Sequence, residues 1–347
     1  MTDMGDRANV LDESGMLGHL RNFPADLAGA WDRSTSWDIS KIERKVYNGV
    51  ICLGMGGSAS GGDFLACLSE LGGCLPFISH RGYELPTWVS KKWLVMVTSY
   101  SGNTEETLDA LECALNLGCD VVGFSSGGVL QSQLEAAEQT WIPLPGGQPP
   151  RSAFGHIFGS QIALVWRLGI QSPPENLGVI LEHLTDAVEA CDFTLEDEEG
   201  DVITEMAQSF IGKQVSILAV QSLSPTAYRA ACQFNENGGV FARSQVIPEM
   251  NHNEIVAWGE ANATENQALL LFSWDGTHER VSLRLEWMLD NIPVEPTWGI
   301  VCEGDSHLEA LLYSVVIMDW LSCAIALLRG KDPTAIGPIN GLKEHLS

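Results

Sequence analysis

Basic residues are scarce in this chain. Its 347 residues include 19 lysines and arginines against 45 aspartates and glutamates, which gives a formal net charge of −26 at pH 7. Nucleic acids and anionic membrane surfaces are recognised largely through basic patches, so we expect neither as a partner. Because the overall field repels anions, an anionic ligand would have to be held by local amides, hydroxyls and a few well-placed cations.

Signatures of metal and nucleotide binding are also missing. The sequence contains no C-x-x-C pair, no H-E-x-x-H pattern and no Gly-Lys-Ser/Thr of a P-loop. These absences argue against a zinc site, a metallohydrolase and a P-loop nucleotidase. The nine cysteines are scattered through apolar segments, which is typical of reduced thiols, so we expect a cytoplasmic location. The acidic, polar first residues predict no secretory signal.

Long hydrophobic runs are limited to one, at residues 311–328. Its length matches a membrane-spanning helix. Asp319 lies in its middle, and no basic clusters flank it, so we expect a buried core helix instead.

Glycine, by contrast, is concentrated at one point. Glycines and serines fill residues 54–62, between a predicted buried strand and a helix expected from Asp63. Glycine lets the backbone approach a ligand closely and aims N–H groups at it, so phosphate is the expected guest. A second predicted strand, 93–98, ends in the Ser/Thr-rich residues 99–104 before another helix. Two such turns would form a cradle for one phosphate group.

Other interpretations of the glycine-rich stretch are open. Gly54-x-Gly56-x-x-Ala59 satisfies the dinucleotide pattern, but that pattern also requires an acidic residue after the next strand. The next candidate strand ends in His80-Arg81 and supplies no carboxylate. A purely structural tight turn is the remaining alternative.

Strands and helices alternate in two separate regions. Such alternation predicts parallel sheets with helices on both faces, so the expected fold class is α/β with two doubly wound subdomains and flanking helices. Strands are expected around Ile51, Phe77, Val95, Val121 and Trp141, and again at 215–220, 269–273 and 298–302. The first turn of the second region, 221–225, lacks glycine, so we expect only the first region to bind phosphate.

Five segments follow from this pattern. We expect a helical lead-in at 1–45 that packs on the first domain, a phosphate-binding domain at 46–150, connecting helices at 151–212, a second domain at 213–305, and a C-terminal helix and tail at 306–347. The acidic run at 196–200 is expected to be a solvated loop.

Further motifs make a family resemblance specific. Gly56-Gly57-Ser58 together with residues 99–104 (SYSGNT) resembles the SIS (sugar isomerase) domain, which binds sugar phosphates. Four more motifs follow in order and cover nearly the whole chain from about residue 45: 148–155 (QPPRSAFG), 235–237 (NEN), 248–254 (PEMNHNE), and 332–334 (DPT) with Leu342-Lys343. Together they resemble the bifunctional phosphoglucose/phosphomannose isomerases.

The resemblance implies an activity and a set of site residues. Such enzymes interconvert glucose 6-phosphate, and its C2 epimer mannose 6-phosphate, with fructose 6-phosphate through a cis-enediol. One carboxylate moves the proton, and no cofactor or metal is implied. The implied base is Glu236, the ring-opening residue is His252, and the cations near the enediolate are Arg151 and Lys343. The implied phosphate-binding residues are Gly56, Gly57, Ser58, Ser99, Ser101 and Thr104.

Several expectations depend on this resemblance. It implies a homodimer with shared active sites, in which His252 comes from the partner subunit. The family often continues Glu-Asn-Ala-Lys, whereas Gly238-Gly239 stands here, a departure that removes a nearby cation. Asn251 could alternatively cap a short helix at 253–256 without any catalysis. Alternative functions are a non-catalytic sugar-phosphate sensor, an SIS isomerase of another phosphosugar, and an aminotransferase half, which lacks the Arg151 and His252 motifs.

Overall fold

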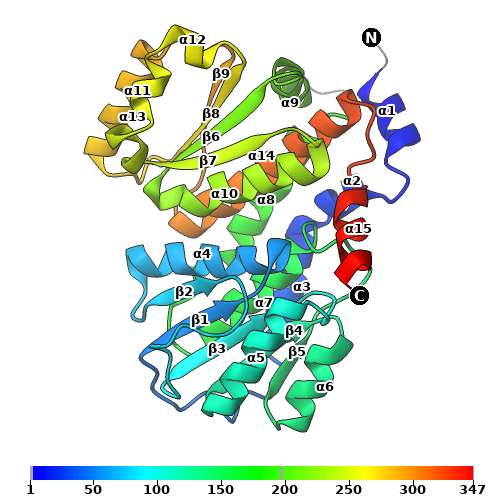
Figure 1. Cartoon of the computed structure of the whole chain (residues 1–347), viewed down its shortest axis with the longest axis vertical. Coiled ribbons are helices and arrows are strands. Elements are labelled where there is room, and N and C mark those ends of the chain that lie inside the picture. Colours follow the sequence, from blue (N-terminus) through cyan, green and yellow to red (C-terminus); the bar gives the residue numbers. More distant parts are fainter. Residues whose placement is uncertain (1–2, 196–197, 347) are drawn as a thin grey trace. The chain divides into compact units, whose positions relative to one another are not determined.

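The chain forms two compact units, each built around one parallel sheet. The computed structural model describes residues 3–195 and 198–346 (Figure 1). One unit is Asn22–Leu181, and the other is Met1–Arg21 with Glu182–Ser347, so the division falls inside helix α8 (Leu177–Cys191). We call them the five-stranded unit and the four-stranded unit, after their sheets.

The five-stranded sheet has the order β2-β1-β3-β4-β5. Every pair of neighbours is parallel. Its strands are β1 (Gly49–Leu53), β2 (Phe77–His80), β3 (Trp93–Thr98), β4 (Asp120–Ser125) and β5 (Thr140–Pro143). In this order the chain turns back across the sheet between β1 and β3, and ligands of such sheets bind beyond the carboxyl ends of those two strands.

Helices cover both faces of this sheet, as the alternating pattern predicted (Figure 1). The helices are α3 (Phe23–Ser34), α4 (Gly56–Gly72), α5 (Glu105–Leu117), α6 (Gly128–Ala136) and α7 (Phe154–Arg167). Side chains of β1, β3 and β4 form a buried cluster with apolar residues of α5 and α6 on one face. Helix α4 packs against β1, β2 and α7 on the other, and α3 packs on α7.

Helix α4 begins seven residues earlier than the sequence predicted. It starts at Gly56, whereas the prediction placed its start at Asp63. Glycine has a low helix propensity, which suggested a loop. Tertiary packing overrides that propensity, because a Cβ atom at Gly61 would lie 1.9 Å from the Gln161 side chain of α7, and one at Gly62 would lie 2.6 Å from Cβ of Cys52. The glycines therefore allow close packing inside a helix.

The four-stranded sheet repeats the same strand order without a fifth strand. Its order is β7-β6-β8-β9, with parallel neighbours throughout. The strands are β6 (Gln214–Val220), β7 (Ala242–Ile247), β8 (Gln267–Ser273) and β9 (Thr297–Val301). The sequence analysis missed β7 and treated the segment as a connection. This strand is polar because it forms a half-exposed edge of the sheet, so its sequence lacks an apolar run.

Helices pack on both faces of this sheet as well. On one face, α13 (Glu279–Asn291), α11 (Ile255–Trp258) and the 3₁₀ turn η3 (Glu249–His252) contribute to a buried apolar cluster. Helix α10 (Ser224–Gln233) contacts β6, β7 and α14 (His307–Leu328). The remaining helices of this unit are α1 (Met4–Leu11), α2 (Met16–Arg21), α9 (Glu198–Ser209), α12 (Ala261–Thr264), α15 (Gly337–Leu346) and the 3₁₀ turn η1 (Gln221–Leu223).

Helix α14 is the apolar run that the sequence singled out. It is long and apolar enough to cross a membrane, but 89% of its apolar window is buried. It contacts α1, α2, α9 and α10. This burial supports the interpretation of α14 as a core helix.

The predicted helical lead-in, residues 1–45, is divided between the two units. Helix α3 packs on α7, whereas α1 and α2 contact α14 in the four-stranded unit. Residues 196 and 197 of the acidic run lie outside the described residues. Helix α9 begins at Glu198, so the predicted loop does not extend to residue 200.

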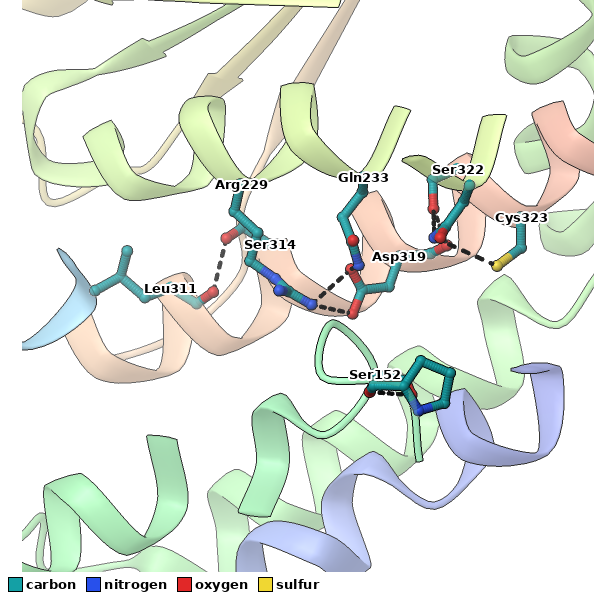
Figure 2. Close-up of polar contacts among 10 residues, drawn as sticks. Ser152, Arg229, Gln233, Leu311, Ser314, Asp319, Ser322 and Cys323 are labelled. Carbon is teal, nitrogen blue, oxygen red and sulfur yellow. Dashed lines mark hydrogen bonds and ion pairs between the residues drawn. The ribbon is translucent and has the colours of Figure 1, made fainter. Parts of the chain in front are cut away.

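A buried ion pair joins α10 to α14 (Figure 2). Arg229 Nη2 donates to both carboxylate oxygens of Asp319, at 2.9 and 2.6 Å. Gln233 Nε2 donates to Asp319 Oδ1 at 2.6 Å. The Arg229 and Asp319 side chains are 2% and 7% exposed. The buried Asp319 carboxylate therefore takes partners from α10, and this pairing links the two helices.

Loss of Arg229 should destabilise the protein strongly. Arg229→Met removes a counter-charge of the buried Asp319 carboxylate, and breaking a buried ion pair in this way costs about 3–5 kcal/mol. The double variant Arg229→Met with Asp319→Leu should recover part of this loss, since neither charge of this pair remains. Denaturant unfolding measures both variants. If the free energy of unfolding of Arg229→Met lies within about 1 kcal/mol of the wild-type value, the pairing of Arg229 with Asp319 does not stabilise the protein as assigned.

Candidate active site

The N-terminus of α4 is the first element of the candidate site. It follows β1 at the point where the chain turns back across the sheet. Its N-cap residue, Met55, makes no side-chain capping bond, and its first turn has no acidic residue. The first amides of Gly56 and Gly57 have no carbonyl within the helix to bond. An anion would complete this helix end by accepting these amides and interacting favourably with the helix dipole.

Hydroxyl groups from the turn after β3 lie beside this helix end. The backbone amide of Tyr100 donates to Ser58 Oγ at 3.1 Å, which joins the two turns directly. Ser99 Oγ and Thr104 Oγ1 are 2.9 Å apart, and the Thr104 amide donates to Ser99 Oγ at 3.3 Å. Ser99 is buried and Ser101 is exposed. The two Gly/Ser turns are thus brought together, as the sequence predicted for a cradle.

The backbone of Arg151 also lies at the start of α4. A Cβ atom added at Gly57 would lie 2.9 Å from both the amide nitrogen and Cα of Arg151, so only glycine permits this contact. Arg151 is only 4% exposed and lies three positions before the first residue of α7, Phe154. The backbone of Arg151, a residue predicted from the sequence, therefore adjoins the helix end that favours an anion.

Hydrogen bonds fix the segment that leads to Arg151. Tyr100 Oη donates to the Pro145 carbonyl at 2.7 Å and accepts from the Gln148 amide at 3.3 Å. Gln148 Nε2 donates to Asp26 Oδ2 of α3 at 2.9 Å. Burial raises the pKa of Tyr100, so its hydroxyl keeps its proton as a donor. The turn after β3 and the Arg151 segment are consequently held as one structure.

The corresponding point of the four-stranded sheet has different chemistry. Pro225 occupies the first turn of α10, where it removes one of the amides that an anion would need. The Trp274 ring, just after β8, stacks on His307 with centroids 5.3 Å apart. Trp274 Nε1 donates to the Gly304 carbonyl at 3.2 Å. These features favour the five-stranded unit as the anion site.

Glu236 lies in a π-helical turn that continues α10. The turn, η2, spans Phe234–Gly238, and Glu236 within it is half-buried. π-turns are rare and occur frequently at functional sites. Gly238-Gly239 stands where the family often has Ala-Lys, so that cation is absent from the sequence here, but another cation contacts the turn. The ammonium group of Lys331 donates to the Glu236 carbonyl oxygen, across 95 positions of sequence.

His252 ends the 3₁₀ turn η3 and is exposed. The alternative role of Asn251 as a helix cap was wrong. Helix α11 has Glu254 as its N-cap residue, and the Asn251 amide instead contacts the sulfur atoms of Met250 and Met288. Glu254 pairs with Arg243 of β7 at 2.9 Å. The loop is therefore anchored on both sides of His252.

Lys343 lies exposed on α15. None of the residues of α15, all of which the structure describes, is buried. The candidate residues thus form two groups. The phosphate-cradle residues and Arg151 come together in the five-stranded unit, whereas Glu236, His252 and Lys343 lie on three different segments of the four-stranded unit. Among the described residues, no group of three or more His, Cys, Asp or Glu side chains could hold a metal ion.

Comparison with known proteins gives the family. Residues 201–346 match the family described as the bacterial phospho-glucose isomerase C-terminal SIS domain. A bifunctional phosphoglucose/phosphomannose isomerase from Aquifex aeolicus is 31% identical over 316 residues, which cover 89% of this chain and 94% of that protein. The chain belongs to the bifunctional phosphoglucose/phosphomannose isomerase family. The resemblance found in the sequence motifs is confirmed.

Two further comparisons concern a second relative and the fold. A D-glucosamine-6-phosphate 4-epimerase from Sulfolobus acidocaldarius is 33% identical over 228 residues, which cover 65% of this chain and 68% of that protein. The solved structure of tagatose-6-phosphate ketose/aldose isomerase from Escherichia coli superposes with a TM-score of 0.68 at 15% identity, over 92% of this chain and 94% of that one. The predicted fold class of two SIS-type parallel-sheet subdomains is confirmed.

Gly57→Ala should weaken phosphate binding in this member of the isomerase family. The added methyl group would displace the Arg151 backbone from the start of α4, so we expect inorganic phosphate to bind roughly tenfold more weakly, a loss of about 1.4 kcal/mol. Calorimetric titration with phosphate measures this. Gly72→Ala is the control, because a Cβ atom there meets nothing within 4 Å in the same helix. Equal phosphate affinity in both variants would contradict the assigned cradle.

Proposed function

We propose that this protein interconverts glucose 6-phosphate, and mannose 6-phosphate, with fructose 6-phosphate. The observation that carries the proposal is the N-terminus of α4, left without a cap or acidic residue beside a cluster of hydroxyls, in a chain of the phosphoglucose/phosphomannose isomerase family. A doubly charged phosphate is the anion that such a helix end and hydroxyl cluster bind well. The phosphate would be held by Gly56, Gly57, Ser58, Ser99, Ser101 and Thr104.

The chemistry requires one carboxylate that serves two neighbouring carbon atoms. In the proposed mechanism Glu236 removes the proton from C2 of the open-chain aldose and returns it to C1, through a cis-enediol. The half-buried position of Glu236 in a π-turn supports this role. Glucose and mannose 6-phosphates differ only at C2 and give the same enediol, so one base can serve both if the site allows rotation about C2–C3. The reaction moves a proton without net oxidation and needs no redox cofactor.

His252 would open the sugar ring by exchanging protons with the ring oxygen and O1, because an imidazole titrates near neutral pH. Arg151 and Lys343 would stabilise the negative charge that develops on the enediolate oxygens. Both His252 and Lys343 are exposed in the single chain, although one lies in the ordered turn η3 and the other on helix α15. This exposure supports a homodimer in which His252 completes the site of the partner subunit, since a two-fold axis would supply each site reciprocally.

A cytoplasmic location is part of the proposal. All nine cysteines are present as thiols. Burial raises the pKa of the Cys52 thiol to about 12, which makes it a poor nucleophile. Thiols that are not paired in disulfides suit a reducing compartment.

Glu236→Gln should abolish most turnover. The amide keeps the shape of the side chain but accepts no proton, so we expect kcat to fall roughly 10²–10⁴-fold. KM should change little, because phosphate contacts dominate binding. A coupled assay should use glucose 6-phosphate, mannose 6-phosphate and glucosamine 6-phosphate. Glu286→Gln is the control, as this exposed carboxylate lies on α13. A Glu236→Gln enzyme with most of the wild-type rate would exclude Glu236 as the base.

The same assay separates the alternative functions. Turnover confined to another phosphosugar would indicate a related isomerase or epimerase. Binding of phosphosugars without turnover of any of them would indicate a sensor, and Glu236→Gln would then leave that binding unchanged.

Mixing two inactive variants tests the shared site. Glu236→Gln and His252→Ala subunits should regain activity when they exchange, since a heterodimer contains one site with both residues intact. We expect at most about a quarter of the wild-type activity at equal mixing, because half of the dimers are mixed and each has one working site. Mass spectrometry of differently tagged subunits verifies exchange. Verified exchange without recovered activity would place His252 in the site of its own chain.

A further inference from the structure

Two cations hold the main chain of the turn that carries Glu236. Lys331 Nζ donates to the carbonyl oxygens of Glu236 and Asn237, the latter at 2.9 Å. Arg329 Nη1 donates to the carbonyl oxygens of Gly238, at 2.8 Å, and Gly239. Four successive carbonyl groups are therefore bound by a guanidinium and an ammonium group that are two residues apart in sequence. We call Arg329 and Lys331 the cationic clamp.

The turn needs such an external support. The last carbonyls of a helix have no amide partner within it, and they carry the negative end of the helix dipole. Two consecutive glycines end this turn, and Gly239 has φ +61°, a left-handed conformation that glycine adopts without strain. Glycine also leaves the backbone conformationally free, so the turn gains little stiffness from its own sequence. Cationic groups at this end of the turn can bind the unpaired carbonyls and hold the glycine backbone in place.

The clamp is built on a rigid base. Arg329 is the C-cap residue of α14, the helix whose Asp319 is fixed by Arg229 and Gln233. Asn237 Nδ2 donates to Ser322 Oγ of the same helix at 2.9 Å, and Ser322 Oγ donates to the Asp319 carbonyl at 2.8 Å. The turn is thus tied to α14 by a side chain on one side and by the clamp on the other.

We infer that Lys331 and Arg329 are positioning residues that fix the turn so that Glu236 can serve two carbon atoms. The inference rests on the proposed function, in which Glu236 is the base. The proton must move between neighbouring carbons from one carboxylate, so a small displacement of the turn removes the carboxylate from one of them. Misplacement of a reacting group by about 1 Å can cost roughly a hundredfold in rate. The phosphate cradle is made by other residues and does not depend on this turn.

Lys331→Met tests the inference. It removes the ammonium group and keeps an apolar stem of similar length, so we expect kcat to fall roughly 10–100-fold while KM changes less than about twofold. Lys331→Arg should restore most of kcat, because a guanidinium can also donate to two carbonyls. Lys213→Met is the matched control. Lys213 Nζ likewise donates to a main-chain carbonyl, that of Glu265, at 3.1 Å in the same unit, and its loss should leave kcat unchanged.

Each outcome decides the matter. An unchanged kcat for Lys331→Met, even with a lower melting temperature, would overturn the inference, as would a rise in KM without a fall in kcat. If Lys331→Met does not fold, Arg329→Gln removes the other half of the clamp and is judged by the same two constants. If Glu236→Gln loses turnover but neither clamp variant does, this inference alone fails. If Glu236→Gln retains turnover, the proposed base itself is wrong.

Discussion

The contact between Gly57 and the backbone of Arg151 constrains the whole five-stranded unit. Helix α4 can begin directly after β1, and lie close to both the sheet and α7, only because it has no side chains at Gly57, Gly61 and Gly62. The same lack of side chains leaves the first amides of the helix uncovered. An acidic chain with few cations can thereby offer a strongly localised positive potential without a basic patch. The glycines of α4 thus account both for its close packing and for its suitability as an anion site.

The four-stranded unit depends in a comparable way on α14. This helix is almost wholly buried, yet it includes a carboxylate, Asp319, whose partners come from α10. Hydrogen bonds then continue through Ser322 to the π-turn. Burying an ion pair adds little net stability. In this unit the pair links α10 to α14, and the turn that carries Glu236 follows α10 directly.

Much of this could be predicted from local sequence. Alternating apolar runs predicted the parallel sheets, and the paired Gly/Ser turns predicted that the segments after β1 and β3 lie together. What failed depended on distant contacts. The early start of α4 is permitted by Gln161 and Cys52, which lie far away in sequence. Strand β7 is polar because it is an edge strand of its sheet. The support from Lys331, 95 positions from Glu236, has no local signal, since a lysine after a glycine is a common surface pattern.

The proline at the start of α10 shows how two sheets with the same strand order can have different functions in one chain. The two sheets share their strand order, but Pro225 and the Trp274–His307 stack leave the second one poorly suited to an anion. Under the proposed function, the first sheet anchors the end of the substrate that is common to all phosphosugars, and the second supplies the base. Loops on the second sheet are then free to diverge without loss of the anchor.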